Sequence, residues 1–158
     1  MKRLSVISLL LVICCFAVAA QEEQEEEAQL LEFDGKTALF AVDGISAQKA
    51  NTLRCAEELL FDRLLYSGID GINDGEPLMN KAREELRKND YAVNFFKKRM
   101  PAYLKTDASG KNVLYEQLGQ AVQTSDGYSC TYLVPIKYNV LIRDLKTEGL
   151  LNAASSTL

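Results

Sequence analysis

The clearest alternation of apolar and polar residues along the chain lies in YSCTYLVPIKY, residues 128–138. A repeat of two is typical of a β-strand with one buried face. One face would carry Tyr128, Cys130, Tyr132, Val134, Ile136 and Tyr138, and the other Ser129, Thr131, Leu133, Pro135 and Lys137. Pro135 has no amide hydrogen for the ladder, so it indicates an edge strand or a bulge.

A second strand is predicted over residues 32–43, EFDGKTALFAVD, with Gly44 as its end. Its two faces would carry Thr37, Leu39 and Ala41 on one side, and Ala38, Phe40 and Val42 on the other. Because both sets are largely apolar, the pattern favours a strand in the interior of a sheet.

A helical repeat follows, and we expect one long helix over residues 47–66. Ser46 is the predicted N-cap, because its hydroxyl can accept a hydrogen bond from a first-turn amide. The main buried face would consist of Ala50, Leu53, Ala56, Leu60 and Leu64. Cys55, Leu59 and Tyr66 lie nearly opposite, which predicts that neighbouring elements cover the helix on two sides.

The middle of the chain predicts a helical connection. Pro77 suits the first turn of a second helix that continues through residues 81–90. Residues 91–100 would form a short helix that Pro101 ends. Residues 113–123 suit either a strand or a helix.

The last third returns to strands and closes with a helix. The Asp126-Gly127 pair predicts a hairpin, and residues 139–151 predict a short helix with Gly149 as its C-terminal stop. The predicted fold class is α+β: an antiparallel sheet packed on one long helix, with a helical connection after it and a short C-terminal helix. We expect a single domain over residues 32–151 and a frayed tail at residues 152–158.

The N-terminus has the pattern of a secretory signal peptide over residues 1–20. Lys2 and Arg3 precede an apolar run at residues 4–18, which is too short to span a bilayer permanently. Small residues lie just before Gln21, as cleavage requires. We therefore expect a periplasmic or secreted protein with no membrane span after signal removal.

Cys14 and Cys15 offer an alternative, which is a lipidated N-terminal cysteine. Lipidation requires a small residue just before the cysteine, whereas Ile13 precedes Cys14 and Cys14 precedes Cys15. The pattern therefore favours cleavage of the signal peptide over lipidation.

The chain is acidic, with 18 Lys and Arg against 22 Asp and Glu and a net charge of −4 at pH 7. Two of the basic residues lie in the signal, which leaves 16 basic residues against 22 acidic ones. Five Glu between positions 22 and 27 are typical of a flexible, solvated leader, which we place at residues 21–31. The remainder is almost neutral, so we expect no nucleic-acid partner, because phosphate binding needs a basic surface.

The chain contains no His. That absence excludes Ser-His-Asp and Cys-His catalysis and removes the commonest transition-metal ligand. A zinc site would need Cys and carboxylates alone, and two Cys remain after the signal. We therefore expect no enzyme activity, no cofactor, and no catalytic or metal-binding residue.

SGIDGINDGEPL, residues 67–78, has the composition of an ion-binding loop but lacks the spacing. Counted from Asp70, position 3 of a calcium-binding loop is Ile72 and position 12 is Lys81. One oxygen ligand and the bidentate acid are therefore missing. We interpret the segment as a turn between helices, whose Gly residues give backbone freedom while Ile69 and Ile72 enter the core.

Two short motifs resemble catalytic or nucleotide-binding signatures. Ser46 and Lys49 match S-x-x-K, which raises a Ser-Lys envelope hydrolase as an alternative. It is the least favoured one. The K-T-G strand motif is missing, and the chain is about half the length that such a fold needs. Gly-Lys-Thr at residues 35–37 resembles the end of a P-loop, but Leu30 stands where the first Gly would, and a strand start is the better interpretation.

Cys55 and Cys130 are the cysteines that follow the signal, and an exported protein could pair them. Their predicted faces point in different directions, which favours two buried thiols and leaves a disulfide as the alternative. The seven Tyr suggest a stacking surface for a sugar as a further alternative, although Tyr128, Tyr132 and Tyr138 share the predicted buried strand face.

FAVDGISAQKANTLRCAEELLFDRLLYSGIDG and YLVPIKYNVLIRDLKTEGLL together carry a resemblance. A strand ends in Val-x-Gly, an Ala-rich helix begins a few residues later, and a final strand leads into a short Leu-rich helix. The pattern resembles the N-terminal domain of flagellar assembly protein T and related small exported α+β envelope domains of Gram-negative bacteria. The resemblance implies an envelope domain that acts by contact without catalysis, and it transfers no functional residue.

We therefore expect an exported cell-envelope protein that works as a non-catalytic interaction or structural module with an envelope protein partner. Its expected contact surfaces are the edge of the last strands and the connection at residues 69–77. The alternative is a small-ligand or ion-binding periplasmic protein that uses residues 70–76 or a Tyr-rich face.

Overall fold

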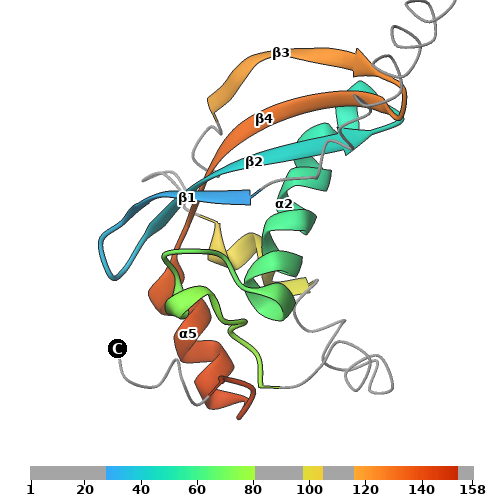
Figure 1. Cartoon of the computed structure of the whole chain (residues 1–158). Helices are drawn as coiled ribbons and strands as arrows, with labels where there is room; N and C mark the ends of the chain where they lie inside the picture. The colour runs from blue at the N-terminus through green and yellow to red at the C-terminus, as the bar shows by residue number, and fades with distance from the viewer. Residues whose placement is uncertain (1–27, 81–97, 105–115, 153–158) are drawn as a thin grey trace, which may run out of the picture.

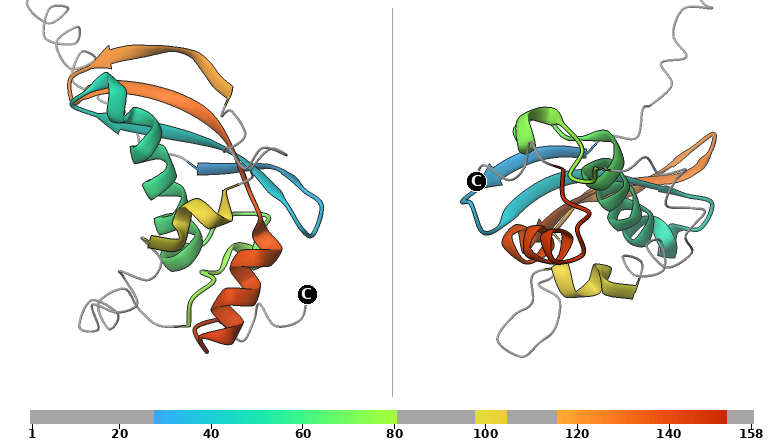
Figure 2. Two further views of the ribbon diagram at one scale, coloured as in Figure 1. Left: turned by 180° about the vertical axis from the view of Figure 1, so that it is seen from behind. Right: turned by 90° about the horizontal axis from the view of Figure 1, so that it is seen from below.

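The structure is a computed structural model that describes residues 28–80, 98–104 and 116–152. Four antiparallel strands form one sheet in the order β1-β2-β4-β3, and α2 and α5 lie on one side of it (Figure 1, Figure 2). The bounds are β1 (Ala28–Phe33), β2 (Ala38–Ser46), α2 (Thr52–Asp62), β3 (Glu116–Thr124), β4 (Gly127–Ile136) and α5 (Tyr138–Thr147). The predicted α+β class, with an antiparallel sheet packed on a helix, is confirmed.

The central strands β2 and β4 bury one face against the helices, as their alternation predicted. Their buried residues are Ala38, Phe40, Val42, Cys130, Tyr132, Val134 and Ile136. The two strands pair from Ala38 opposite Ile136 to Ser46 opposite Tyr128. The prediction of an interior strand is confirmed, because β2 lies between β1 and β4. The intervening residues of both strands are half-buried.

Pro135 is not on an edge strand, because β4 lies between β2 and β3. The ladder between β3 and β4 begins where Glu116 faces Leu133, so Pro135 lies beyond it. Pro135 pairs with Leu39 of β2 instead. The missing amide hydrogen is therefore accommodated at a point where β4 has only one strand neighbour.

The predicted strand over residues 32–43 is in fact two strands joined by a hairpin turn. The Asp34 carboxylate accepts hydrogen bonds from the amides of Lys36 at 2.8 Å and Thr37 at 2.6 Å. Gly35 has a φ of +81°, which favours glycine at this position. As a consequence, β1 includes residues 28–31, which the sequence had assigned to the leader, and residues 21–27 lie outside the described part.

The hairpin between β3 and β4 is confirmed. Thr124 pairs with Gly127 across the turn at Ser125 and Asp126. The ambiguous segment is a strand from Glu116 onward, and residues 105–115 are not described.

The long helix begins later than predicted. A 3-10 turn at Lys49–Asn51 precedes α2, and a π-helical turn at Arg63–Ser67 follows it. Ser46 is therefore not the N-cap, because β2 continues through Gly44 to Ser46. Of the predicted face, Ala56, Leu60 and Leu64 are buried, Leu53 is half-buried and Ala50 is exposed.

Residues 68–80 run along the β1 edge of the sheet and return to the core (Figure 1). The amide of Leu78 donates to Leu64 at 3.0 Å, and the amide of Met79 donates to Leu65 at 3.1 Å. Pro77 therefore precedes an extended segment, and the predicted helix does not begin there. The remainder of that helix, residues 81–90, lies outside the described residues, as do residues 91–97.

The C-terminal part closes the core below the sheet. Residues 98–103 are helical, so the helix includes Pro101 and does not end before it. The carbonyl of Tyr103 accepts from the amide of Lys137 at 2.6 Å, just before α5 begins. Gly149, with a φ of +67°, ends the last helix as predicted, because the Leu150 amide turns back to the Leu145 carbonyl at 2.9 Å. The expected tail, residues 152–158, is described only at position 152.

Candidate functional site

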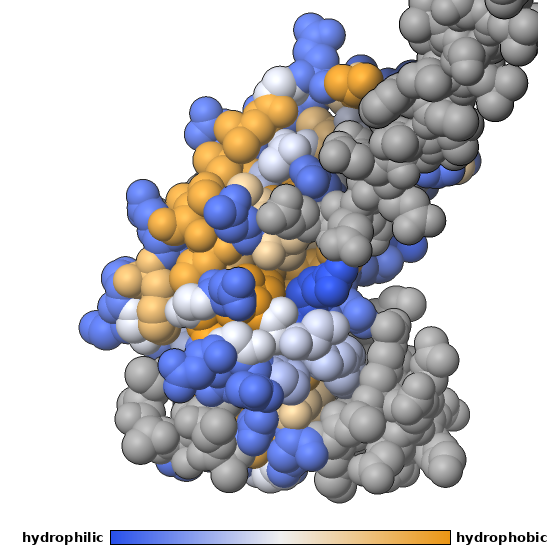
Figure 3. Space-filling view, viewed as in Figure 1, coloured by the Kyte–Doolittle hydropathy of each residue, from blue (hydrophilic) through white to orange (hydrophobic). Residues whose placement is uncertain are grey.

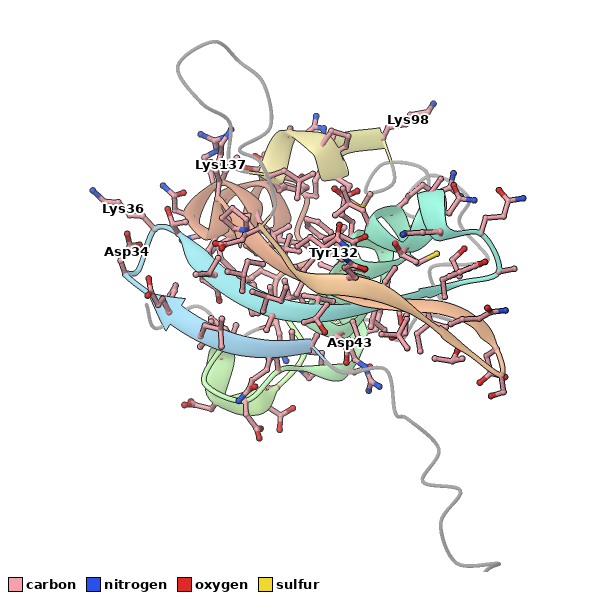
Figure 4. All side chains as sticks on the ribbon, turned by 90° about the horizontal axis from the view of Figure 1, so that it is seen from above. Asp34, Lys36, Asp43, Lys98, Tyr132 and Lys137 are labelled. Atoms are coloured by element: carbon pink, nitrogen blue, oxygen red, sulfur yellow. The ribbon has the colours of Figure 1, made fainter. Side chains whose placement is uncertain are left out.

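The side of the sheet away from the helices forms an apolar surface, which we call the open face. It consists of Leu39, Ala41, Asp43 and Ile45 of β2, Ser129, Thr131, Leu133 and Pro135 of β4, and Glu116, Leu118 and Val122 of β3. Figure 4 shows Tyr132 on the helix side of the sheet and Asp43 on the opposite side. Within the described residues, no helix covers this surface (Figure 2).

The open face exposes large apolar side chains near the β3 edge. Leu118 is 45% exposed and Val122 is 63% exposed. Both lie opposite polar residues of β4, since Leu118 faces Thr131 and Val122 faces Ser129. Figure 3, which has the viewpoint of Figure 1, shows apolar side chains gathered over β3 and β4. Leu31, which is 47% exposed, lies at the register shift between Leu30 and Glu32 of β1.

Two polar residues of the open face are hydrogen-bonded to each other. The Thr131 hydroxyl donates to the Asp43 carboxylate at 2.6 Å, and the two residues face each other across β2 and β4. This hydrogen bond fixes the carboxylate near the centre of the surface. A half-buried carboxylate among apolar neighbours attracts a positively charged group more strongly than a fully solvated one.

The free edge of β3 is irregular. The register between β3 and β4 shifts between Leu118 and Val122, and Gly119 within this interval has a φ of +83°. Such a bulge interrupts the row of backbone groups that another strand would need for pairing. The expected surface at the edge of the last strands is therefore β3 alone, and its side chains are better placed for contact than its backbone.

Residues 67–78 form a turn, as predicted, although no helix begins at Pro77. The acidic residues of this turn, Asp70, Asp74 and Glu76, are exposed. Ile69 and Ile72 are buried, as expected, and pair with each other in an isolated bridge. The Asn73 amide group donates to the carbonyls of Glu76 at 3.0 Å and Pro77 at 3.3 Å. Within the described residues, no three acidic or sulfur side chains come close enough to hold a metal ion, so the geometry gives the calcium alternative no support.

The S-x-x-K pair gains no support from its geometry. Ser46 ends β2, and its hydroxyl accepts from the amide of Gln48 at 3.3 Å. Lys49 is exposed, whereas a lysine that acts as a base needs a desolvated site. The P-loop resemblance at residues 35–37 belongs to the β1–β2 turn rather than to a strand start.

The two cysteines are free thiols, and they differ in burial. Cys130 is 4% exposed on the helix side of β4, and Cys55 is half-buried on α2. The expectation of two buried thiols therefore holds for Cys130 only.

The alternative of a tyrosine stacking surface is wrong for Tyr132 and Tyr138, because these side chains are 8% and 3% exposed and belong to the core.

Sequence reasoning missed the open face because it did not ask what covers the second apolar face of the strand predicted over residues 32–43. One signal was available. Leu39 and Ala41 of β2 pair with Pro135 and Leu133 of β4, so the outer side of the two strands is apolar at this end. A second apolar sheet face requires a second covering layer.

Comparison with family models, curated proteins and solved structures finds no match to this chain. The resemblance to flagellar assembly protein T therefore remains an expectation from the sequence. Among the helices within the described residues, none is both long and apolar enough to cross a membrane.

Proposed function

We propose that the protein is exported and acts in the cell envelope, without catalysis, as an interaction or structural module. The observation that carries this proposal is the open face, where Leu118 and Val122 are 45% and 63% exposed among other apolar residues. Contiguous exposed apolar surface on a small domain typically marks a binding site for another protein. The signal-like pattern over residues 1–20 supports export, and the absence of His from the chain supports a role in contact rather than catalysis.

Site-specific photocrosslinking in intact cells of the source organism tests the proposal. A photoreactive residue replaces Val122 on the open face, and a control replaces Arg54 of α2, whose side chain is 71% exposed on the other side of the sheet. We expect a discrete adduct with a second protein from position 122 and none from position 54. The absence of an adduct from position 122 and from position 118 would overturn the proposed surface.

Export is tested separately by the mass of the protein recovered from cells. Cleavage after residue 20 predicts a chain that begins at Gln21 and is found in the periplasmic or secreted fraction. An intact N-terminus in the cytoplasmic fraction would contradict the localisation. A lipid-modified N-terminus at Cys14 or Cys15 would instead indicate cleavage just before that cysteine and anchoring to a membrane.

A further inference from the structure

The four strands contain three charged residues, and all three are acidic. They are Glu32 of β1, Asp43 of β2 and Glu116 of β3. Each lies opposite a residue of the open face, because Glu32 faces Leu39, Asp43 faces Thr131 and Glu116 faces Leu133. The apolar surface therefore carries negative charge at its centre and at both of its edges.

We infer that the open face binds an amphipathic α-helix of a partner protein, with an apolar stripe flanked on both sides by Lys or Arg. This inference rests on the proposed function and names the chemistry of the partner. The apolar stripe would lie on β2 and β4, over Leu39, Ala41 and Leu133. The flanking cations would reach Glu32 at one edge and Glu116 at the other.

The dimensions of the sheet suit such a helix. Neighbouring strands lie about 4.8 Å apart, so β1 and β3 are separated by roughly 14 Å across β2 and β4. A helix with its side chains is about 10–12 Å wide, which leaves its two flanks above the two edge strands. The nine residues of β2 extend over roughly 30 Å, which is the length of a helix of about 20 residues. Sheet faces of this kind are commonly covered by helices, as α2 covers the opposite face.

The same charges disfavour the other occupants. A second copy placed face to face would bring two acidic faces together, each with Glu32, Asp43 and Glu116, and like charges at an interface oppose association. An anionic membrane surface would be repelled for the same reason. A strand added to β3 would meet the register shift between Leu118 and Val122.

The test uses the full mature chain and three synthetic peptides of about 20 residues, a helix length that matches the sheet. The first has leucines spaced at i, i+3, i+4 and i+7, which form one apolar stripe along a helix, and lysines on both sides of that stripe. The second replaces every lysine by glutamate. The third keeps the composition of the first but scrambles its order, so that the apolar stripe is lost. Fluorescence anisotropy of labelled peptide measures the dissociation constants at low and at physiological salt.

Two variants of the protein separate local charge from net charge. Glu32→Gln with Glu116→Gln removes the two edge carboxylates, and Glu58→Gln with Glu148→Gln removes two exposed carboxylates from the helical side. Both variants have the same net charge. We expect the first to weaken binding of the lysine peptide by about fivefold, the effect of two partly exposed ion pairs, and the second to leave it unchanged. The effect should shrink as salt rises.

The inference requires that the lysine peptide bind at least about tenfold more tightly than either other peptide. Equal binding of the scrambled peptide would show attraction to net charge alone and overturn it. Equal binding of the glutamate peptide, or no binding of any peptide, would overturn it as well. A dimer that forms as the protein concentration rises, and that Val122→Lys abolishes, would assign the open face to a second copy of this chain. That result would also overturn the inference.

These outcomes are independent of the proposed function, which rests on the crosslink from position 122. When that adduct forms, sequencing of the crosslinked peptide shows whether the partner segment has apolar residues at helical spacing with Lys or Arg on both sides of them. An acidic or non-helical segment would overturn the inference while the interaction module stands. The absence of an adduct from both position 122 and position 118 would remove the proposed function itself.

Discussion

Thr52 and Tyr132, which lie 80 residues apart in the chain, share a buried hydrogen bond of 2.7 Å between their hydroxyl oxygens. Thr52 is 1% exposed at the start of α2, and Tyr132 is 8% exposed on β4. The Thr52 hydroxyl also lies 2.9 Å from the Lys49 carbonyl, which can only accept. Thr52 therefore donates to Lys49 and accepts from Tyr132, and the pair attaches the first turn of α2 to the sheet.

Removal of either hydroxyl should destabilise the protein, and by different amounts. Thr52→Val leaves the Tyr132 hydroxyl buried without this acceptor, which costs roughly 1–3 kcal/mol. Tyr132→Phe leaves Thr52 bonded to Lys49, so we expect about 1 kcal/mol. Urea denaturation of both variants and the double variant measures the free energy of unfolding. If the two losses simply add, the hydroxyls are not coupled and this assignment is wrong.

Gly44→Ala should be more harmful than an ordinary glycine substitution. A Cβ at position 44 would overlap the carbonyl oxygen of Thr52, so α2 would have to move away from the sheet. We expect a loss of roughly 3 kcal/mol in the free energy of unfolding, as for an overpacked core. Gly35→Ala is the matched control, because a Cβ there meets nothing within 4 Å and only its φ of +81° opposes the change. The control should lose about 1 kcal/mol, and equal losses would contradict the close contact at Gly44.

Tyr103 and Tyr138 offer a contrast between a bonded and an unbonded phenol. The Tyr103 hydroxyl donates to the Asp144 carboxylate at 3.2 Å, whereas the buried Tyr138 hydroxyl has no hydrogen-bond partner among the described residues. Tyr103→Phe should therefore lower the free energy of unfolding by about 1–2 kcal/mol. Tyr138→Phe should leave it unchanged or raise it slightly, because a buried unsatisfied polar atom is removed. Thermal unfolding of both variants gives the comparison, and a large loss for Tyr138→Phe would contradict the unbonded hydroxyl.

The buried tyrosines predict an alkaline transition. Burial raises the pKa of Tyr138 to about 12, and burial together with the neighbouring Asp144 raises that of Tyr103 to about 12. Burial also raises the pKa of Tyr132. Because a tyrosine in the unfolded chain titrates near pH 10, the stabilisation is complete below about pH 10 and is lost as pH rises towards about 12.

Stability followed by circular dichroism across this range, together with phenolate absorbance near 295 nm, should show unfolding and ionisation as one event at about pH 10–12. Tyr138→Phe should shift the transition to higher pH, because one neutral buried phenol no longer needs to ionise. Ionisation of all seven tyrosines near pH 10 without unfolding would contradict the burial of these side chains.

Leu118→Ser with Val122→Ser should change the free energy of unfolding by less than about 0.5 kcal/mol, because both side chains are largely exposed. The same double variant should abolish the adduct formed from a photoreactive residue at Glu116, which lies on the open face of β3. Chemical denaturation and crosslinking measure the two effects separately. A large loss of stability would mean that the fold itself needs these side chains.

The sequence predicted the elements whose periodicity is local and failed where a turn or a neighbour decided the outcome. The alternation of β4 and the stop at Gly149 follow from the side-chain period and from backbone freedom, and both are observed. The pattern places the Asp34-Gly35 turn within a strand, although a similar pair, Asp126-Gly127, predicts a hairpin. The turn at Asp34 divides an apolar run whose pattern continues on both sides, so periodicity alone does not reveal it.

The start of the long helix shows a second kind of failure. Ser46 is a good N-cap by residue type, but in the structure it is the last paired residue of β2, opposite Tyr128. The strand pairing extends past Gly44 because the absence of a Cβ lets the Thr52 carbonyl approach. Tertiary contact therefore outweighs a capping preference that is worth only about 1 kcal/mol.

By itself the sequence determined the residue types, and these fix the absence of histidine chemistry, the acidic balance, the signal-like N-terminus and the α+β class. Only the tertiary structure decided which side of the sheet stays open. The outward residues of β2 and β4 are as apolar in sequence as many core residues, and they differ only in having no described helix above them. Burial is a property of what packs against a residue, so Val122 and Val134 share a side chain but not a role: one is 63% exposed and the other is fully buried.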